Sequence, residues 1–215
     1  MVEMAGCRGG SARPCCGRNS LPAGHAMPRI PYPETTEITP ENAALLADLP
    51  DLNVFRMMAR AGAAFGPFMA LVNSYLNNGT LDPQLRELVI LRVGHAAGAA
   101  YEIWHHERVS RELGMSEERM AAAKGPLPCS LFSDAENAAL KLTDDIVANT
   151  RAGDQTFAAA HTHLGDNQTT ELVVIVGVYQ MVCTFLETMG IEIEDGPVPE
   201  GRLEKIASGV TRHGR

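Results

Sequence analysis

The sequence has 215 residues, 45% hydrophobic residues and a formal net charge of −8, which suits one domain with a sizeable core and excludes a disordered composition. An acidic chain repels phosphate backbones, so we expect no nucleic-acid partner. Aromatic residues are only 5% of the chain, whereas helix-forming residue types are plentiful, a balance that favours helices over a β-sandwich. The expected fold class is all-α.

We expect neither a membrane partner nor a disulfide framework. The longest apolar run, Leu172 to Val178, contains Gly177 and is far shorter than the roughly 20 residues of a membrane span. An odd number of cysteines without a signal-peptide pattern fits a reducing cytoplasm. The five cysteines are Cys7, Cys15, Cys16, Cys129 and Cys183.

The N-terminal part, residues 1–39, divides into a tail and an arm. Residues 1–26 are rich in Gly, Pro, Ser and Arg and are expected to be disordered. They are either a true tail or lie upstream of the native start, since Met27 opens a more ordinary N-terminus. The Pro-rich segment from Pro28 to Pro40 is expected to form an extended arm across a surface or a neighbouring subunit. We therefore place the domain at 40–195 and a C-terminal tail at 196–215.

About eight helices are expected from capping signals and apolar periodicity. Asp82-Pro83 is a strong helix start, because a capping side chain precedes Pro at the first helical position. Ser133 and Glu136 form a capping box for a later helix. After Gly190 we expect little contribution to the core, and Ile191–Glu194 alternates like a strand but has no partner. The expected helices cover 41–49, 53–65, 67–76, 83 to the Gly94–Gly98 break, 99–113, 133–149, 154–164 and 167–189, with Gly165 ending the seventh.

An internal sequence repeat indicates two related helical units in the domain. The segment that begins at Asp82 resembles the one that begins at Asp166, each with a Glu at its sixth position before an apolar run. Chance similarity of two capped helices is the alternative. The second copy has Leu186 and Gly190 where the first has Glu102 and His106, so only the first unit can carry their chemistry.

The candidate catalytic residues are Glu87, Glu102 and His106. Residues three and four apart share a helix face, so Glu102 is expected beside both His105 and His106. A carboxylate next to an imidazole raises its pKa and fixes its tautomer, as general acid–base catalysis requires. If the helices on either side of the Gly94–Gly98 break pack antiparallel, Glu87 reaches the same pocket.

At these residues the chain resembles the carboxymuconolactone decarboxylase/AhpD superfamily. The AhpD branch has Glu-x(11)-Cys-x-x-Cys-x-x-x-His; here Glu87 and His106 match, while Ala99 and Glu102 replace the two cysteines. The decarboxylase branch commonly has Tyr-Glu-Trp followed by His, and this chain has Trp one place later. Further similarities are Arg86-Glu87-Leu88, Tyr101-Glu102-Ile103-Trp104-His105-His106, Gly114-Met115-Ser116, and Glu171-Leu172 with Tyr179.

The resemblance implies an AhpD-like fold and a cofactor-independent lyase, a decarboxylase, or an isomerase, acting on a small cyclic acid or lactone. His106 would then be the proton donor or acceptor, Glu102 would orient it, and Glu87 would be the second titrating group. The remaining substrate-binding candidates are His105, Arg86, Tyr101 and Trp104, although a surface salt bridge suits Arg86 better. The resemblance also implies that the chain forms a homotrimer or homohexamer.

Three alternatives stay open at this point. In the first, the chain is a non-catalytic helical oligomer that binds a ligand or partner. In the second, His105 and His106 have only a structural role. A thiol peroxidase is disfavoured, because Cys129 and Cys183 do not supply the dithiol spacing. Glu102-x-x-His105 matches half of a di-iron helix motif, but the chain has no second Glu-x-x-His. An intersubunit or mononuclear metal site is the remaining metal alternative; we expect no metal and no other cofactor.

Overall fold

The computed structural model describes residues 28–195, and the expected tails at 1–26 and 196–215 lie outside the described residues. The described part is all-α, without a strand. Its elements are the 3₁₀ helices η1 (Thr35–Glu37) and η2 (Ala59–Ala64) and the α-helices α1 (Pro40–Asp48), α2 (Asn53–Met58), α3 (Phe65–Asn78), α4 (Pro83–Ala97), α5 (Ala100–Glu112), α6 (Glu117–Ala122), α7 (Asp134–Asn149) and α8 (Asp154–Met189).

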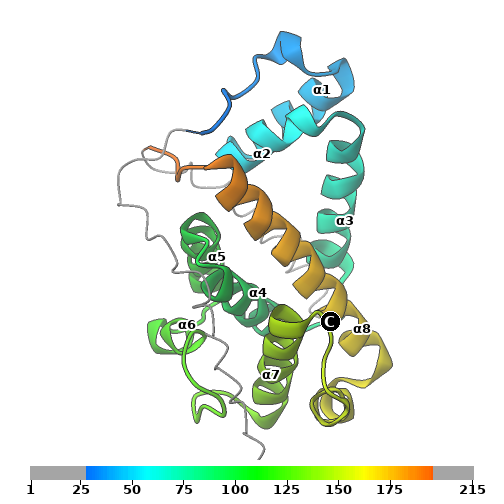
Figure 1. Ribbon diagram of the computed structural model, residues 1–215, viewed down its shortest axis with the longest axis vertical. Coiled ribbons are helices and arrows are strands. Elements are labelled where there is room, and N and C mark those ends of the chain that lie inside the picture. The colour runs from blue at the N-terminus through cyan, green and yellow to red at the C-terminus, as the bar shows by residue number, and fades with distance from the viewer. Residues whose placement is uncertain (1–27, 196–215) are drawn as a thin grey trace, which may run out of the picture.

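Helix α4 is the centre of the core, with α5, α7 and α8 packed against it. Its residues from Leu85 to Leu91 are all buried, so neighbours cover it on every side and not only on one apolar face. Asp82 caps its first turn by accepting hydrogen bonds from the N–H groups of Gln84 and Leu85. In Figure 1, α8 runs diagonally between α3 on one side and the α4, α5 and α7 group on the other.

The connection between α4 and α5 sets the geometry of the site. Gly98 ends α4 in the left-handed region at φ 71°, a conformation that glycine adopts without steric cost. A Cβ on Gly94 would lie 3.3 Å from the Ile103 side chain, so Gly94 lets α5 approach α4 closely. The two helices can therefore face each other across a short turn.

The structure differs from the expected helices in three places. The helix expected over 53–65 ends at Met58 and continues as 3₁₀ turns, because Gly62 takes a non-helical φ of 59°. Helix α6 was not expected; it is a short element with Ser116 as its N-cap. The helices expected over 154–164 and 167–189 are one element, α8, with a kink at Gly165, where φ is 68°.

Helix α8 passes a length and composition test for a membrane span, with a mean hydropathy of 1.8 over its best window. Leu172, Ile175, Val176 and Leu186 of this helix are fully buried or nearly so and pack into the core. Its place as a core helix beside α4 and α7 accounts for one apolar face, whereas Val173, Val174 and Met181 lie on an exposed face.

The arm before α1 and the segment after Gly190 pack together at the C-terminal end of α8. The arm is held there by the Arg29 N–H, which donates to the Met189 carbonyl at 2.9 Å. Contrary to expectation, the segment after Gly190 belongs to the core, since Ile191 is buried. The Tyr32 hydroxyl also donates to Glu192 at 3.0 Å, so the arm packs against the segment after Gly190 of its own chain.

Candidate active site

A small cavity of about 100 Å³ lies where α2, α3, α5 and α8 meet beside α4. Its wall is mostly apolar, and its polar side chains come from α3, α4, α5 and α8. The apolar lining residues are Leu52, Val54, Phe55, Phe68, Val72, Leu76, Val109 and Val182; the polar ones are Tyr75, Glu87, Tyr101, Glu102, His105, His106 and Tyr179. The three predicted catalytic residues therefore meet at one cavity.

Glu87 and His106 form the closest contact in the site. Glu87 Oε2 lies 2.6 Å from His106 Nδ1, and the guanidinium of Arg86 donates to the other carboxylate oxygen at 3.2 Å. Both the Glu87 and Arg86 side chains are almost completely buried. Burial alone would raise the pKa of Glu87, but the adjacent His106 and Arg86 hold it below the usual value.

Glu102 approaches the opposite edge of the imidazole. Its Oε1 lies 3.0 Å from His106 Nε2, at the i,i+4 spacing of α5, so the imidazole has a carboxylate at each of its two nitrogens. Although burial lowers the pKa of His106, the carboxylates of Glu87 and Glu102 raise it to about 10. The ring is thus an imidazolium between two carboxylates near neutral pH.

His105 turns away from Glu102, against the expectation that Glu102 would sit beside both histidines. Its Nε2 lies 2.9 Å from Glu194 Oε2. Glu194 Oε1 accepts hydrogen bonds from the Tyr101 hydroxyl and the Asn53 N–H, each at 2.6 Å. Burial raises the pKa of Glu194, but these hydrogen bonds lower it to about 2. The i,i+3 spacing of Glu102 and His105 did not anticipate this, because Glu194 lies 89 positions away in the sequence.

The four substrate-binding candidates occupy different places. Tyr101 and His105 line the cavity, whereas Arg86 and Trp104 do not. Arg86 is 2% exposed and forms a buried ion pair, so the expected surface salt bridge is wrong. Trp104 packs edge-on against His105 at 4.7 Å, and the guanidinium of Arg108 lies over its ring.

Tyr75 and Tyr179 complete the wall; Tyr179 belongs to the residues that carry the family resemblance, whereas Tyr75 was not singled out in the sequence. Tyr179 of α8 meets the His106 ring edge-on, with centroids 5.1 Å apart. Tyr75 of α3 meets Tyr179 in the same manner at 6.3 Å. Glu171 corresponds to Glu87 in the internal sequence repeat. It accepts hydrogen bonds from the backbone N–H and the hydroxyl of Thr80, in the loop before α4.

Within the described range, no group of three His, Cys, Asp or Glu side chains is arranged to hold a metal ion. The half di-iron pair of Glu102 and His105 is divided between different partners, His106 and Glu194. The candidate site is thus built from hydrogen-bonded and ion-paired groups.

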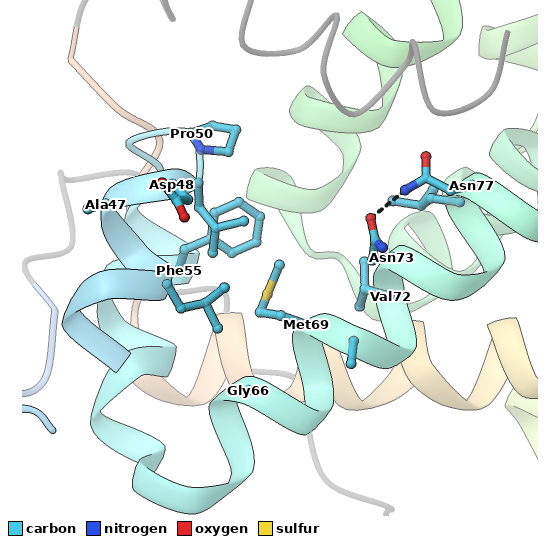
Figure 2. A pocket seen from close by; sticks show the side chains of 13 residues that line it. Ala47, Asp48, Pro50, Phe55, Gly66, Met69, Val72, Asn73 and Asn77 are labelled. Carbon is cyan, nitrogen blue, oxygen red and sulfur yellow. Dashed lines mark hydrogen bonds between the residues drawn. The ribbon is translucent and has the colours of Figure 1, made fainter. Parts of the chain in front are cut away.

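A larger groove of about 520 Å³ adjoins the cavity between α1, α2 and α3. Figure 2 shows Met69 pointing toward Phe55 within it, and Asn77 hydrogen-bonded to Asn73 on its rim. Phe55, Val72 and Leu76 line both hollows. No histidine, cysteine or glutamate lines the described groove, so the acid–base groups belong to the smaller cavity.

Comparison with known proteins gives a family match over the central helices. Residues 61–145 match the model of the carboxymuconolactone decarboxylase family. The uncharacterized protein YdfG of Bacillus subtilis is 27% identical over 107 residues, which are 49% of this chain and 73% of YdfG. The family match contains Glu87, Glu102 and His106.

Solved structures with the same fold include two described as enzymes or enzyme-related. An alkylhydroperoxidase AhpD core from Ralstonia eutropha JMP134, an uncharacterized peroxidase-related protein, superposes with a TM-score of 0.67 at 17% identity, covering 80% of this chain and 95% of its own. The debrominase Bmp8, in complex with 2,3,4-tribromopyrrole, gives 0.57 at 18% identity, covering 77% and 86%. At such identities the likeness concerns the fold alone.

Proposed function

We propose that this chain, which has an AhpD-like fold and matches the model of the carboxymuconolactone decarboxylase family over residues 61–145, is a cofactor-independent lyase or isomerase. Its substrate is a small cyclic acid or lactone, and its chemistry is proton transfer by glutamate and histidine. The observation that carries the proposal is the continuous contact of Glu87, His106 and Glu102 at the wall of a mostly apolar cavity.

The protonation states of the contacting residues support a separate role for each of them. His106 is protonated near neutral pH, because its pKa is about 10, so it acts as an acid and a fixed positive charge. Glu102 lines the cavity beside the imidazole and is the base. Glu87 is completely buried and positions the imidazolium.

The proposed reaction is a proton shift beside a carbonyl group. Glu102 takes the proton from a ring carbon, and the electron pair moves into the carbonyl to form an enolate-like species. The positive charge of His106, held in an apolar cavity, stabilises that developing negative charge. The proton returns to a different carbon in an isomerisation. In a decarboxylation, loss of CO₂ forms the enolate and His106 protonates the carbon.

Thiol peroxidase chemistry has less support, although some structural neighbours are described as peroxidase-related. The positions that carry cysteine in the AhpD motif are Ala99 and Glu102. Cys183 is buried, and burial with the nearby Glu102 raises its pKa to about 12. A thiol of this kind is a poor nucleophile at neutral pH.

We also propose that the protein is a homotrimer or homohexamer. Supporting this, α8 presents Val173, Val174 and Met181 to solvent, each more than two-fifths exposed. Apolar side chains that gather on one helix face are typical of protein interfaces. Sedimentation of the full-length protein measures the assembly.

The test follows deuterium incorporation from D₂O by NMR into small lactones, cyclic ketones and ring acids, together with CO₂ release. Wild-type protein is expected to exchange a carbon-bound proton beside the carbonyl. His106→Gln and Glu102→Gln should each lower the rate by at least about a hundredfold. Glu107→Gln is the matched control, because Glu107 lies on the same helix with its carboxylate paired to the exposed Arg111.

Equal exchange rates in wild type and His106→Gln would defeat the assignment. Absence of turnover on every compound would favour a non-catalytic ligand-binding protein instead.

A further inference from the structure

Within residues 28–195, the cavity lies closest to solvent on the side of α2 and α3. Its lining residues from α4 and α8, and those from α5 except His106, are buried. Its part-exposed apolar residues all belong to α2 and α3, two of the three helices that form the larger groove. They are Phe55, Phe68, Val72 and Leu76. A ligand therefore enters the cavity from the side of the groove.

Single side chains separate the groove from the cavity. Phe55, Val72 and Leu76 line both hollows, so each of them presents one side to the groove and another to the cavity. All three are part-exposed, and side chains near solvent change rotamer on the picosecond to nanosecond timescale. The two hollows can thus hold the two ends of one molecule.

The volumes of the two hollows divide such a molecule unequally. An engineered apolar cavity of about 150 Å³ binds benzene, so a cavity of about 100 Å³ holds no more than the ring of a small lactone. The groove measures about 520 Å³ and has room for a substituent of several carbon atoms. A substituent on the reacting ring must therefore lie in the groove.

The walls of the groove suit an uncharged, apolar substituent. Figure 2 shows Phe55 and Met69 in the middle of the groove, with Asp48 on one side and Asn73 on the other. Among the residues that the structure describes, its lining contains no lysine, arginine or histidine. A substituent that ends in a carboxylate would meet the carboxylate of Asp48 and find no cation. An alkyl chain would instead bury apolar surface against Phe55 and Met69.

We infer that the groove binds the alkyl substituent of a lactone whose ring lies in the cavity. This inference rests on the proposed proton-transfer site and narrows its substrates to lactones with an uncharged chain. Val72 and Leu76 then lie beside the bond that joins the ring to its chain.

The experiment compares γ-butyrolactone with γ-nonalactone, which carries a pentyl chain on the same ring, by NMR titration of the full-length protein near neutral pH. γ-Nonalactone should bind at least about tenfold more tightly, because the burial of each methylene group adds to the affinity. The analogue whose chain ends in a carboxylate should lose most of that gain. An equal gain for the charged analogue would contradict the assignment of an uncharged chain.

Two substitutions obstruct the groove from residues that do not line the cavity. Gly66 of α3 and Ala47 of α1 line only the groove, and a Cβ on Gly66 would meet no other atom within 4 Å. Gly66→Phe and Ala47→Trp should each reduce the affinity for γ-nonalactone to that for γ-butyrolactone, which should itself stay unchanged. Ala121→Trp, on the exposed surface of α6, is the control and should alter neither affinity.

Equal affinity for the two lactones, or a gain that persists in both groove variants, would overturn the inference. Absence of binding of either lactone at about 10 mM would also overturn it. A loss of assembly in both groove variants, measured by sedimentation, would instead assign the groove to a contact with a second copy of the chain.

These outcomes are independent of turnover. Tighter binding of γ-nonalactone without proton exchange would leave the groove as a binding site and remove the proposed function. Proton exchange in γ-butyrolactone with no gain from the alkyl chain would keep the proposed function and remove this inference.

Discussion

His106 Nδ1 lies 2.6 Å from Glu87 Oε2, although the two residues are 19 positions apart and belong to different helices. The carboxylate is completely buried, and Arg86 occupies its other oxygen. A buried charge persists only where opposite charges and hydrogen bonds compensate it. The pair therefore fixes both the protonation state of His106 and the spacing of α4 and α5.

Removing the Glu87 charge should lower the pKa of His106. In Glu87→Gln we expect the NMR titration midpoint of His106 to fall by at least about one unit, because one of two adjacent anions is lost. Glu107→Gln on the same helix is the control. Identical midpoints in the two variants would contradict the account.

The stability of the protein should also depend on His106 at alkaline pH. Its folded pKa, about 10, is above the ordinary histidine value of 6.5, so its contribution to stability is present below about pH 6.5 and is lost as the pH rises through about 10. Urea unfolding at several pH values should show this loss in wild type. A His106→Asn variant should show a flatter alkaline limb; an unchanged limb would argue against a charged His106.

The buried ion pair of Arg86 should matter far more than an exposed one. Arg86→Met leaves Glu87 with His106 as its remaining partner and should reduce the free energy of unfolding by about 3 kcal/mol. Arg111→Met breaks the exposed pair with Glu117 and should change stability little. Chemical denaturation measures both, and equal effects would show that burial of the Arg86 charge has no special importance.

Glu194 should position His105 and Tyr101 for the cavity. Glu194→Gln removes the charged acceptor that both side chains share, so the rate of proton exchange should fall. Glu192→Gln is the neighbouring control, because the Glu192 side chain bonds to Tyr32 outside the cavity.

The same substitution has a distinct signature in acid. The folded pKa of Glu194 is about 2, below the ordinary glutamate value of 4.5, so its stabilising contribution is present above about pH 4.5 and is lost as the pH falls through about 2. Wild type should thus be more stable than Glu194→Gln at neutral pH, and the difference should shrink on acidification. A constant difference would contradict this role.

The cysteines of the domain should be dispensable for catalysis. Cys183 is 1% exposed and has a raised pKa, so it should react with iodoacetamide far more slowly than the half-buried Cys129. A Cys129→Ala, Cys183→Ala double variant should retain proton exchange. Dithiol-dependent reduction of a hydroperoxide that disappears in this variant would instead favour thiol chemistry.

The sequence by itself determined the local elements that carry the site. Asp82 with Pro83 predicted the start of α4, and the capping box at Ser133 predicted the start of α7. The i,i+4 spacing placed Glu102 beside His106 on one helix face. These features depend on contacts within a few residues, and helix geometry fixes such contacts wherever the helix lies.

The tertiary structure decided which distant groups meet. The turn at Gly98 brings α5 back along α4, and this places Glu87 against His106. Glu194 takes His105 away from Glu102, while Tyr75 and Tyr179 join the wall from α3 and α8. Such contacts depend on how whole helices pack around the core, and packing is a property of the assembled surfaces rather than of any one segment's spacing.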